Sequence, residues 1–423
     1  MYLLVQTLLV ASLGLASALS LPARGDTRKR AAYLLSNNPS GDNLLALSIS
    51  VDDGTLSNPV LTTTGGNGLL GNTANGTGGP DGLFSQGAVV ISQDVSIPPL
   101  STSMRTPMTI PYNLTNPNQY LFAVNPGCNT LSMFRISPLD PTHPKLIDQP
   151  CDTMGDFPMS VTYSSVLKTA CVLNGGAKGG VACFHADHAK GLTPLGGLRP
   201  FPISLNQTTP PTGPPMTASD IVFNPSSTAL FATIKGDAMA LPPKSGYIYA
   251  WPVHDGEVAI SPVTNRLAAL KMDFSIDFLG RDTSALITDP SFGASIVEVA
   301  YPSLAITEKH HIVVPNQLAA CWGAYAPRFD AAYIIDAGHT NITVVDPESG
   351  AVKGVIGYDA GAKGGLDTAI ERTWMYVLTG DSSVVVLDLE GSGYGKGARQ
   401  VQTYDLAGEG VKGHWQGMAV YPS

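Results

Sequence analysis

Charged residues are scarce in this sequence. Only 13% of its 423 residues are charged, with 24 Lys and Arg against 33 Asp and Glu, and the formal net charge is −9. The basic residues form no cluster that could neutralise a run of phosphates, so nucleic acid is not an expected partner. After the N-terminus no stretch reaches about 18 uninterrupted apolar residues, the length that a membrane-spanning helix needs. We therefore expect no membrane span in the body of the chain.

Aromatic residues are also few, at 7%, whereas the chain contains 45 Gly and 33 Pro beside 43% hydrophobic residues. This combination is typical of short buried strands joined by many turns, and it argues against long amphipathic helices. The length alone would suggest two or three domains, but repeat architectures and large all-β folds exceed that estimate.

The N-terminus has the pattern of a secretory leader. An apolar run from Leu3 to Ala18 ends in the small residues Ala16-Ser17-Ala18, which a signal peptidase can cut. We predict a signal peptide over residues 1–18 and a secreted protein, extracellular or in the cell wall. Residues 19–30 end in the basic triplet Arg28-Lys29-Arg30, and they are either a pro-segment removed by proteolysis or a charged linker.

Five cysteines in an oxidising compartment should mostly pair, and one must be left over. Cys171 and Cys183 flank a hairpin-like turn, and Cys128 and Cys151 bracket another strand pair, so the preferred arrangement is two local bridges with Cys321 unpaired. Other pairings remain open. Four Asn-x-Ser/Thr sequons, at Asn75, Asn113, Asn206 and Asn341, are candidate sites of N-glycosylation.

One unit recurs seven times: a short apolar strand, a turn with Asn, Gly, Asp or Pro, and a second strand. The units lie at 32–49, 120–136, 169–184, 230–251, 285–299, 332–346 and 375–388. The later units start roughly 45 to 60 residues apart, the length of one four-stranded propeller blade. The sequence therefore predicts an all-β, seven-bladed propeller over residues 31–423.

Candidate inner strands precede several of these units, at 107–112, 158–163, 218–225, 321–325 and 366–370. The C-terminal segment 417–421 resembles them but has no blade after it. We expect it to pair with the strand from Ala31 and close the ring. The Gly/Asn/Thr-rich stretch 61–80 is predicted to be an inserted surface loop. The alternative architecture, a pair of β-sandwiches, is disfavoured by the repeat count.

These units resemble the seven-bladed lactonase propellers, which include bacterial 6-phosphogluconolactonase-type and fungal carboxymuconate-cyclase-like proteins. The resemblance covers residues 31–423, and it depends on the repeated units, on the Asp-Pro-x-x-Gly turn within Val344–Gly350, and on Val222-Phe223-Asn224-Pro225. With the leader and the sequons, the chain looks most similar to the secreted fungal branch, some of whose members are glycoprotein antigens or surface adhesins.

The family's enzymes place His, Arg and acidic side chains where inner strands begin, facing the channel. A proton-transfer site needs a base and a cation together. Two matching positions in this chain, Pro107-Met108 and Pro158-Met159, supply neither. The remaining candidates for catalysis are Asp220, Arg328, Asp367 and His414, and those for ligand binding are Trp322, Trp415 and Gln416. The alternative is that the two Asp residues bind backbone amides and that the aromatic rings pack in the core.

No metal or cofactor site is expected. His185 and His188 have a ligand-like spacing but no third ligand nearby, and no Gly-x-Ser-x-Gly elbow occurs. The glycine-rich segments 175–180 and 361–365 lack the following helix of a phosphate-binding loop, and we interpret them as hairpin turns.

Two functions from different classes remain. The first is a secreted, non-catalytic, monomeric glycoprotein of the antigen or adhesin type, which binds host or matrix macromolecules through its loops. The second is a cofactor-free lactonase or cycloisomerase that acts on a small carboxylate or lactone. The sequence favours the first because the inner-strand positions lack a base and a cation, and the two are distinguished by whether Asp220, Arg328, Asp367 and His414 converge in one pocket.

Overall fold

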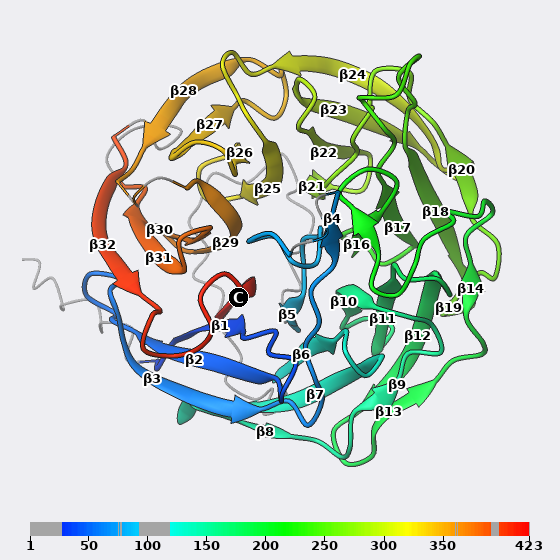
Figure 1. The fold of residues 1–423 in the computed structure, drawn as a ribbon. Helices are drawn as coiled ribbons and strands as arrows, with labels where there is room; N and C mark the ends of the chain where they lie inside the picture. Colours follow the sequence, from blue (N-terminus) through cyan, green and yellow to red (C-terminus); the bar gives the residue numbers. More distant parts are fainter. Residues whose placement is uncertain are drawn as a thin grey trace, which may run out of the picture.

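The structure is a computed structural model that describes residues 28–74, 76, 78–92, 119–359, 361, 363–390 and 397–422. Within these ranges the regular structure consists of strands, and no helix there is long and apolar enough to cross a membrane. Seven sheets are arranged around a central axis like the blades of a propeller (Figure 1), and we use the word channel for the region along this axis between the inner strands. The predicted fold is therefore confirmed.

Each blade has four main strands, which follow one another from the channel outward. Blade 1 contains β33 (Gln416–Tyr421), β1 (Ala31–Leu35), β2 (Asn43–Ile49) and β3 (Leu56–Thr63), and blade 2 contains β5 (Val89–Ile91), β6 (Gln119–Asn125), β7 (Thr130–Ser137) and β8 (Asp140–Leu146), with β9 (Cys151–Asp152) beside β7. Blade 3 contains β10 (Pro158–Ser164), β11 (Thr169–Asn174), β12 (Gly180–Asp187) and β13 (Gly191–Pro194), with β14 (Arg199–Pro200) beside β12, and blade 4 contains β16 (Ala218–Phe223), β17 (Ala229–Ile234), β18 (Tyr247–His254) and β19 (Glu257–Val258), with β20 (Val263–Asn265) beside β18.

The remaining blades follow the same order. Blade 5 contains β21 (Ile276–Arg281), β22 (Ser284–Asp289), β23 (Gly293–Ala300) and β24 (Ala305–Val313), blade 6 contains β25 (Ala320–Ala326), β26 (Ala331–Asp336), β27 (Asn341–Val345) and β28 (Val352–Gly357), and blade 7 contains β29 (Gly365–Glu371), β30 (Trp374–Thr379), β31 (Ser383–Asp388) and β32 (Arg399–Asp405).

The position of a strand within its blade explains its sequence. The second and third strands, such as β26 and β31, are packed on both faces by neighbouring blades, and they are continuous apolar runs with almost every residue buried. The outermost strands, such as β24 and β28, have one face in solvent and contain many exposed polar residues. The seven units found in the sequence are the buried middle pairs, which carry the strongest pattern.

The ring closes as predicted. In blade 1 the C-terminal β33 pairs antiparallel with β1, with Ala31 opposite Tyr421 and Ala32 opposite Val420. Directly before β1, Arg30 donates from Nη1 to Oε2 of Glu371 at 2.7 Å, and both side chains are almost completely buried. The backbone oxygen of Arg30 accepts a hydrogen bond from the N–H of Ile49. These contacts join the first blade to the last.

The predicted 61–80 surface loop is wrong in part. Residues 61–63 belong to β3, and β4 (Asn72–Thr73) pairs in parallel with β15 (Thr212–Gly213), between blades 3 and 4. Several glycines of this stretch lie where a side chain would clash. A Cβ on Gly68 would lie 2.0 Å from the backbone carbon of Asn37.

Two inner strands also differ from the prediction. The innermost strand of blade 2 is β5, at Val89–Ile91, whereas the predicted segment 107–112 lies outside the described residues. The innermost strand of blade 5, β21, was not predicted because its sequence ends in Gly280 and Arg281 and lacks the apolar run of the other strands. The remaining inner strands lie where the sequence places them.

Candidate functional site at the channel mouth

All inner strands begin at the same end of the channel, which we call the channel mouth. Four of them have an irregular register directly after their first residue: β10 between Pro158 and Ser160, β16 between Ala218 and Asp220, β25 between Ala320 and Trp322, and β29 between Gly365 and Asp367. Such a bulge leaves backbone groups without a ladder partner. At the mouth, side chains therefore have to bind the N–H groups that the ladder does not.

Asp220 does this in blade 4. Its Oδ1 accepts from the N–H of Ile221 at 2.8 Å and from Oγ of Ser160 at 3.3 Å, and its Oδ2 accepts from the N–H of Ile276 at 3.0 Å. The side chain therefore connects β16 with its neighbours β10 and β21. Burial, together with the nearby charge of Asp277, raises the pKa of Asp220 to about 7.

Asp367 has the equivalent position in blade 7. Its Oδ1 accepts from the N–H of Thr368 at 2.7 Å, and the backbone N–H of Gly87 also binds the carboxyl group. Burial raises the pKa of Asp367 well above its usual range, and the charge of Asp220 adds to the shift. The structure thus brings two predicted site residues together, in the backbone-binding role.

Residues 80–88, which we call the mouth segment, fill the space between the inner strands. Gln86 binds β25 twice, with Nε2 donating to the oxygen of Gly323 at 3.1 Å and Oε1 accepting from its N–H at 3.2 Å. On the other side the oxygen of Gly87 accepts from the N–H of Val161 in β10. Nε2 of Gln416, a predicted ligand-binding residue, donates to the oxygen of Pro80 at 3.0 Å. The mouth segment therefore joins at least three blades.

A buried lysine fixes the same segment. Lys235 follows β17, and its Nζ donates to the oxygen of Phe84 at 2.6 Å, to the oxygen of Ala218 at 3.0 Å and to Oγ1 of Thr217 at 3.1 Å. The ammonium group also lies 4.6 Å from the ring centre of Phe274. Burial lowers the pKa of Lys235, and the nearby carboxylate of Asp81 opposes the shift. Its three donors are all bound to protein oxygens.

Arg328 does not join this group. It lies in the turn between β25 and β26, two residues after the end of β25, where its exposed guanidinium is 3.6 Å from Oε1 of Glu390. Because β25 extends for roughly 20 Å along the channel, Arg328 is at the opposite end from Cys321. Arg328 therefore does not share a pocket with the two acids, since sequence proximity to an inner strand does not say at which end a residue lies.

His414 is on the mouth side. It directly precedes Trp415 and β33, it is half-buried, and its Nδ1 has no hydrogen-bond partner among the described residues. The backbone beside it is fixed, because the N–H of Gly413 donates to Oγ of Ser382 at 2.8 Å. The structure therefore places His414 at the same end of the channel as Asp220 and Asp367 without a bond between the ring and either acid.

The two candidate tryptophans are core residues. Trp322 and Trp415 are each 2% exposed, and their indole N–H groups lack hydrogen-bond partners within the described part of the chain. Trp322 packs against Phe274 with ring centres 4.7 Å apart, and a Cβ on Gly410 would lie 2.6 Å from the ring of Trp415. Neither ring has a face open to a ligand, so the predicted stacking role is replaced by packing.

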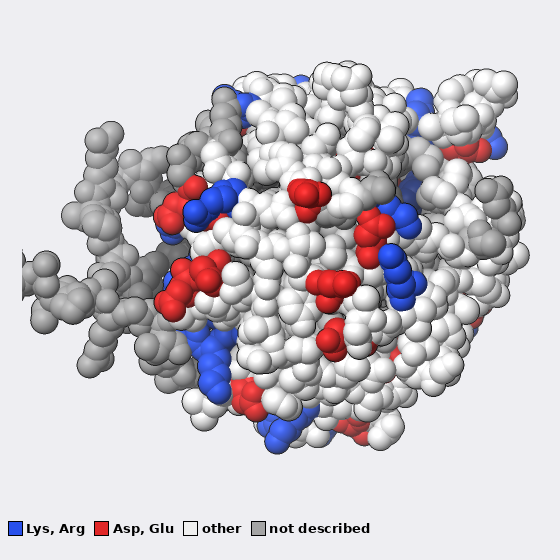
Figure 2. All heavy atoms as spheres, turned by 60° about the vertical axis from the view of Figure 1, so that its left-hand side comes forward, with Lys and Arg blue, Asp and Glu red and all other residues white. Residues whose placement is uncertain are grey.

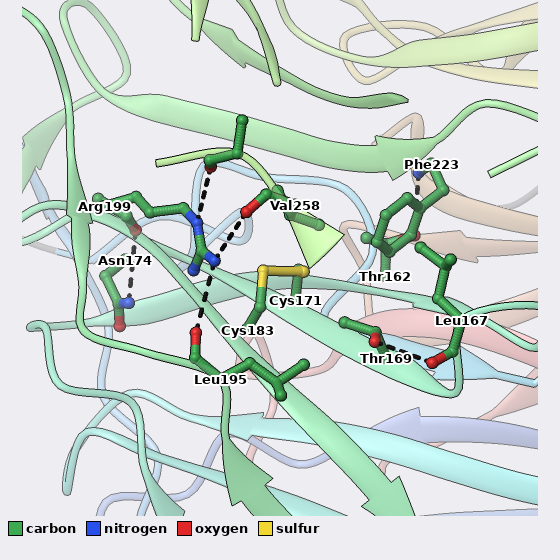
Figure 3. Close-up of a disulfide and its surroundings, with 12 residues drawn as sticks. Thr162, Leu167, Thr169, Cys171, Asn174, Cys183, Leu195, Arg199, Phe223 and Val258 are labelled. Carbon is green, nitrogen blue, oxygen red and sulfur yellow. Dashed lines mark hydrogen bonds between the residues drawn. A yellow bond between two sulfur atoms is a disulfide. The ribbon is translucent and has the colours of Figure 1, made fainter. Parts of the chain in front are cut away.

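One of the two predicted disulfides is present. Cys171 of β11 and Cys183 of β12 are directly opposed, with their Cα atoms 4.1 Å apart, and they form a bridge (Figure 3). Cys128 and Cys151 are free, which corrects the second pairing. In that hairpin Cys151 pairs with Leu131, so Cys128 lies three residues before the position opposite Cys151. Cys321 is free and buried, and burial raises the pKa of its thiol well above the usual range.

The glycosylation sites divide into two groups. Asn75 and Asn113 lie outside the described residues. Asn206 is exposed in the loop between β14 and β15, whereas Asn341 is half-buried at the start of β27. Across the described part of the chain, no group of three or more His, Cys, Asp or Glu residues has the geometry to hold a metal ion.

Sequence reasoning missed Lys235, Asp81 and Gln86. The lysine had a signal, since it is a lone charge that directly follows the buried strand Ala229–Ile234. Asp81 and Gln86 had none, because they lie directly after the stretch interpreted as a surface loop. In the described residues, no His or Arg side chain hydrogen-bonds to Asp220 or Asp367.

Comparison with known proteins shows which fold this chain shares with solved structures. No family model matches the sequence, and no curated protein matches it. Among solved structures, a "putative 6-phosphogluconolactonase" from Bacteroides fragilis has 12% identity and a TM-score of 0.61, over 94% of this chain and 99% of the other. The periplasmic gluconolactonase of Pseudomonas aeruginosa has 12% identity and a TM-score of 0.58, over 89% and 96%. At these identities the likeness shows that the chain shares the propeller fold of lactonase-like proteins.

Proposed function

We propose that this chain is a secreted, glycosylated propeller that binds extracellular macromolecules through its loops and does not turn over a small molecule, as in the antigen- and adhesin-type members of the fungal carboxymuconate-cyclase-like branch. The observation that carries the proposal is how the polar side chains at the channel mouth are hydrogen-bonded. The polar groups that a channel enzyme would present to its substrate are bound to the protein itself.

Three features of the mouth support this. Asp220 and Asp367 are 2% and 4% exposed and accept hydrogen bonds from backbone N–H groups. Lys235 is completely buried, and each of its three donors already has an acceptor. Arg328, the remaining cationic candidate, is on the far end of β25. A base and a cation that act on one substrate need a common, accessible pocket.

The surface favours protein contacts over a charged ligand. Figure 2 shows Lys, Arg, Asp and Glu scattered over one side of the ring, with large uncharged areas between them. The loop between β17 and β18 carries Met239 and Leu241, which are 86% and 96% exposed. Apolar side chains presented at a loop tip suit a protein partner, because contact with one removes them from water.

A screen for lactone hydrolysis and muconate cyclisation tests the proposal. The purified secreted chain is compared with His414→Ala, which changes the half-exposed histidine at the mouth, and with Arg328→Ala as the matched control at the opposite end. We expect no turnover from any of the three proteins. Turnover that His414→Ala abolishes and Arg328→Ala retains would establish a channel enzyme and overturn the proposal.

A second candidate is a cofactor-free lactonase or cycloisomerase that acts on a small carboxylate or lactone. The likeness to gluconolactonase structures over 89% or more of this chain favours it. This function requires the mouth segment to leave the inner strands, because its residues occupy the hydrogen-bonding groups there. Limited proteolysis between residues 80 and 88 in the presence of a lactone or muconate tests that requirement, since a displaced segment would be cut faster.

A further inference from the structure

The two sequons that the structure describes differ in their surroundings. Asn206 lies in the loop of residues 201–211, outside every strand, and its side chain is exposed. Asn341 is the first residue of β27, opposite Gly357 of β28. Residues i and i+2 of a strand point to the same face, and Thr343 is 3% exposed. The side chain of Asn341 therefore lies on the same face of β27 as the buried side chain of Thr343, and it is itself half-buried.

The local geometry of Asn206 presents its amide nitrogen. Its φ is 51°, in the left-handed region that Asn tolerates better than most residues. Oδ1 accepts from Oγ of Ser204 at 2.9 Å, which orients the amide group. Within the described residues Nδ2 makes no hydrogen bond, so the atom to which an N-linked sugar attaches is available. The third sequon residue, Thr208, is also exposed.

The loop around Asn206 is fixed in place. Nε2 of Gln207 donates to the oxygens of Thr212 at 3.2 Å and Met216 at 3.1 Å. Oγ1 of Thr209 donates to Oδ2 of Asp156 at 3.0 Å and accepts from the N–H of Ala177 at 3.0 Å. These contacts, made by the residue within the sequon and by the residue directly after it, fix the loop next to Asn206 against blade 3.

A shallow groove of about 230 Å³ lies beside Asn206, which forms part of its wall. One side is the glycine-rich turn at Gly176, Ala177 and Gly179, and the other is residues 200–207. The turn contributes almost no side chain, so the space next to Nδ2 stays open. A sugar attached at Asn206 would therefore lie next to this groove.

We propose that Nδ2 of Asn206 carries an N-linked oligosaccharide whose first sugar lies over this groove, and that Asn341 carries none. The proposal rests on the proposed secretion of the chain. In the transfer, the anomeric carbon of a lipid-diphosphate-linked oligosaccharide leaves its diphosphate oxygen and bonds to Nδ2, which loses one proton. The lipid diphosphate is the leaving group, and no oxidant or reductant is needed.

The test is expression of the full chain in a eukaryotic secretory host, once with its own leader and once with the leader of an established secreted protein in place of residues 1–18. The chain is treated with a peptide N-glycosidase, an amidase that converts a sugar-linked Asn to Asp. Peptide mass spectrometry then detects this conversion at each site. We expect conversion at position 206 and none at 341. On intact protein, Asn206→Gln and Thr208→Val should each remove one oligosaccharide mass, and Asn341→Gln should remove none.

The two leaders separate the two proposals. Retention of the chain in the cell with its own leader, but conversion at 206 with the other leader, overturns secretion and supports the glycan. Unmodified Asn206 in secreted protein, or conversion at 341, overturns the glycan proposal. Thr208→Val keeps Asn206 and its hydrogen bond to Ser204, so loss of the oligosaccharide in that variant reports the sequon rather than a folding defect.

Discussion

The channel mouth and the outer rim of the ring both contain charged side chains, but they use them differently. At the rim, Glu348 of the turn after β27 pairs with Arg281 and with Lys309, whose Nζ is 2.8 Å from Oε1, and these side chains are 34% to 64% exposed. At the mouth, Lys235 and Asp220 are 0% and 2% exposed and bind backbone groups from different blades. Substitution of a charged residue should therefore change the free energy of unfolding little at the rim and strongly at the mouth, because the mouth excludes water and the rim does not.

Removal of the buried lysine should have the largest effect. Lys235→Met removes the buried ammonium group that donates to the oxygens of Phe84 and Ala218 and lies near the carboxylate of Asp81. We expect a loss of about 4 kcal/mol in the free energy of unfolding. Urea denaturation followed by intrinsic fluorescence measures it. The rim control is Lys309→Met, and equal losses in the two variants would contradict the difference between the regions.

The closure of the ring should be nearly as sensitive. Glu371→Gln removes the negative charge that lies 2.7 Å from the buried guanidinium of Arg30, so we expect a loss of about 3 kcal/mol in the free energy of unfolding. The matched control is Glu390→Gln, whose exposed partner Arg328 is 3.6 Å away. Thermal unfolding at neutral pH compares them. A larger effect from Glu390→Gln would mean that the Arg30–Glu371 pair does not hold the first and last blades together.

The buried position of Asp220 should make the stability of the protein depend on pH. An Asp in an unfolded chain titrates near pH 4, whereas burial raises the pKa of Asp220 to about 7 in the folded protein. Between these values the folded state keeps a proton that the unfolded chain has lost, so Asp220 makes stability decrease as pH rises from about 4 to 7. Denaturation across this range should show a smaller decrease for Asp220→Asn. An unchanged slope would show that Asp220 titrates normally.

The smallest effect is expected at the rim. The side chains of Arg281 and Lys309 hold the pKa of Glu348 at about 2, yet the carboxylate is in solvent. Glu348→Gln should leave the midpoint of thermal unfolding unchanged, both at low salt and at about 1 M salt. A clear shift at low salt that disappears at high salt would show that the rim ion pairs contribute more than their exposure suggests.

The sequence predicted the blades because each middle strand pair is a local pattern that recurs. It could not predict the mouth, where the contacts join residues far apart in the chain, such as Gln86 and Gly323. Asp220 and Asp367 could be found because they lie on recognisable inner strands, and a backbone-binding role for them is common at strand ends. Arg328 was placed at the wrong end, and Cys128 and Cys151 were paired wrongly, because spacing along the chain does not fix the register between strands.

If the triplet Arg28-Lys29-Arg30 is a processing site, the burial of Arg30 sets the order of cleavage and folding. A protease that cuts after Arg28-Lys29-Arg30 must bind this stretch as an extended strand, with the last arginine in its own pocket. Once β33 has paired with β1, that arginine is 2% exposed and its carbonyl is bound to Ile49. Cleavage there therefore competes in time with ring closure, and a chain that folds first keeps Arg30.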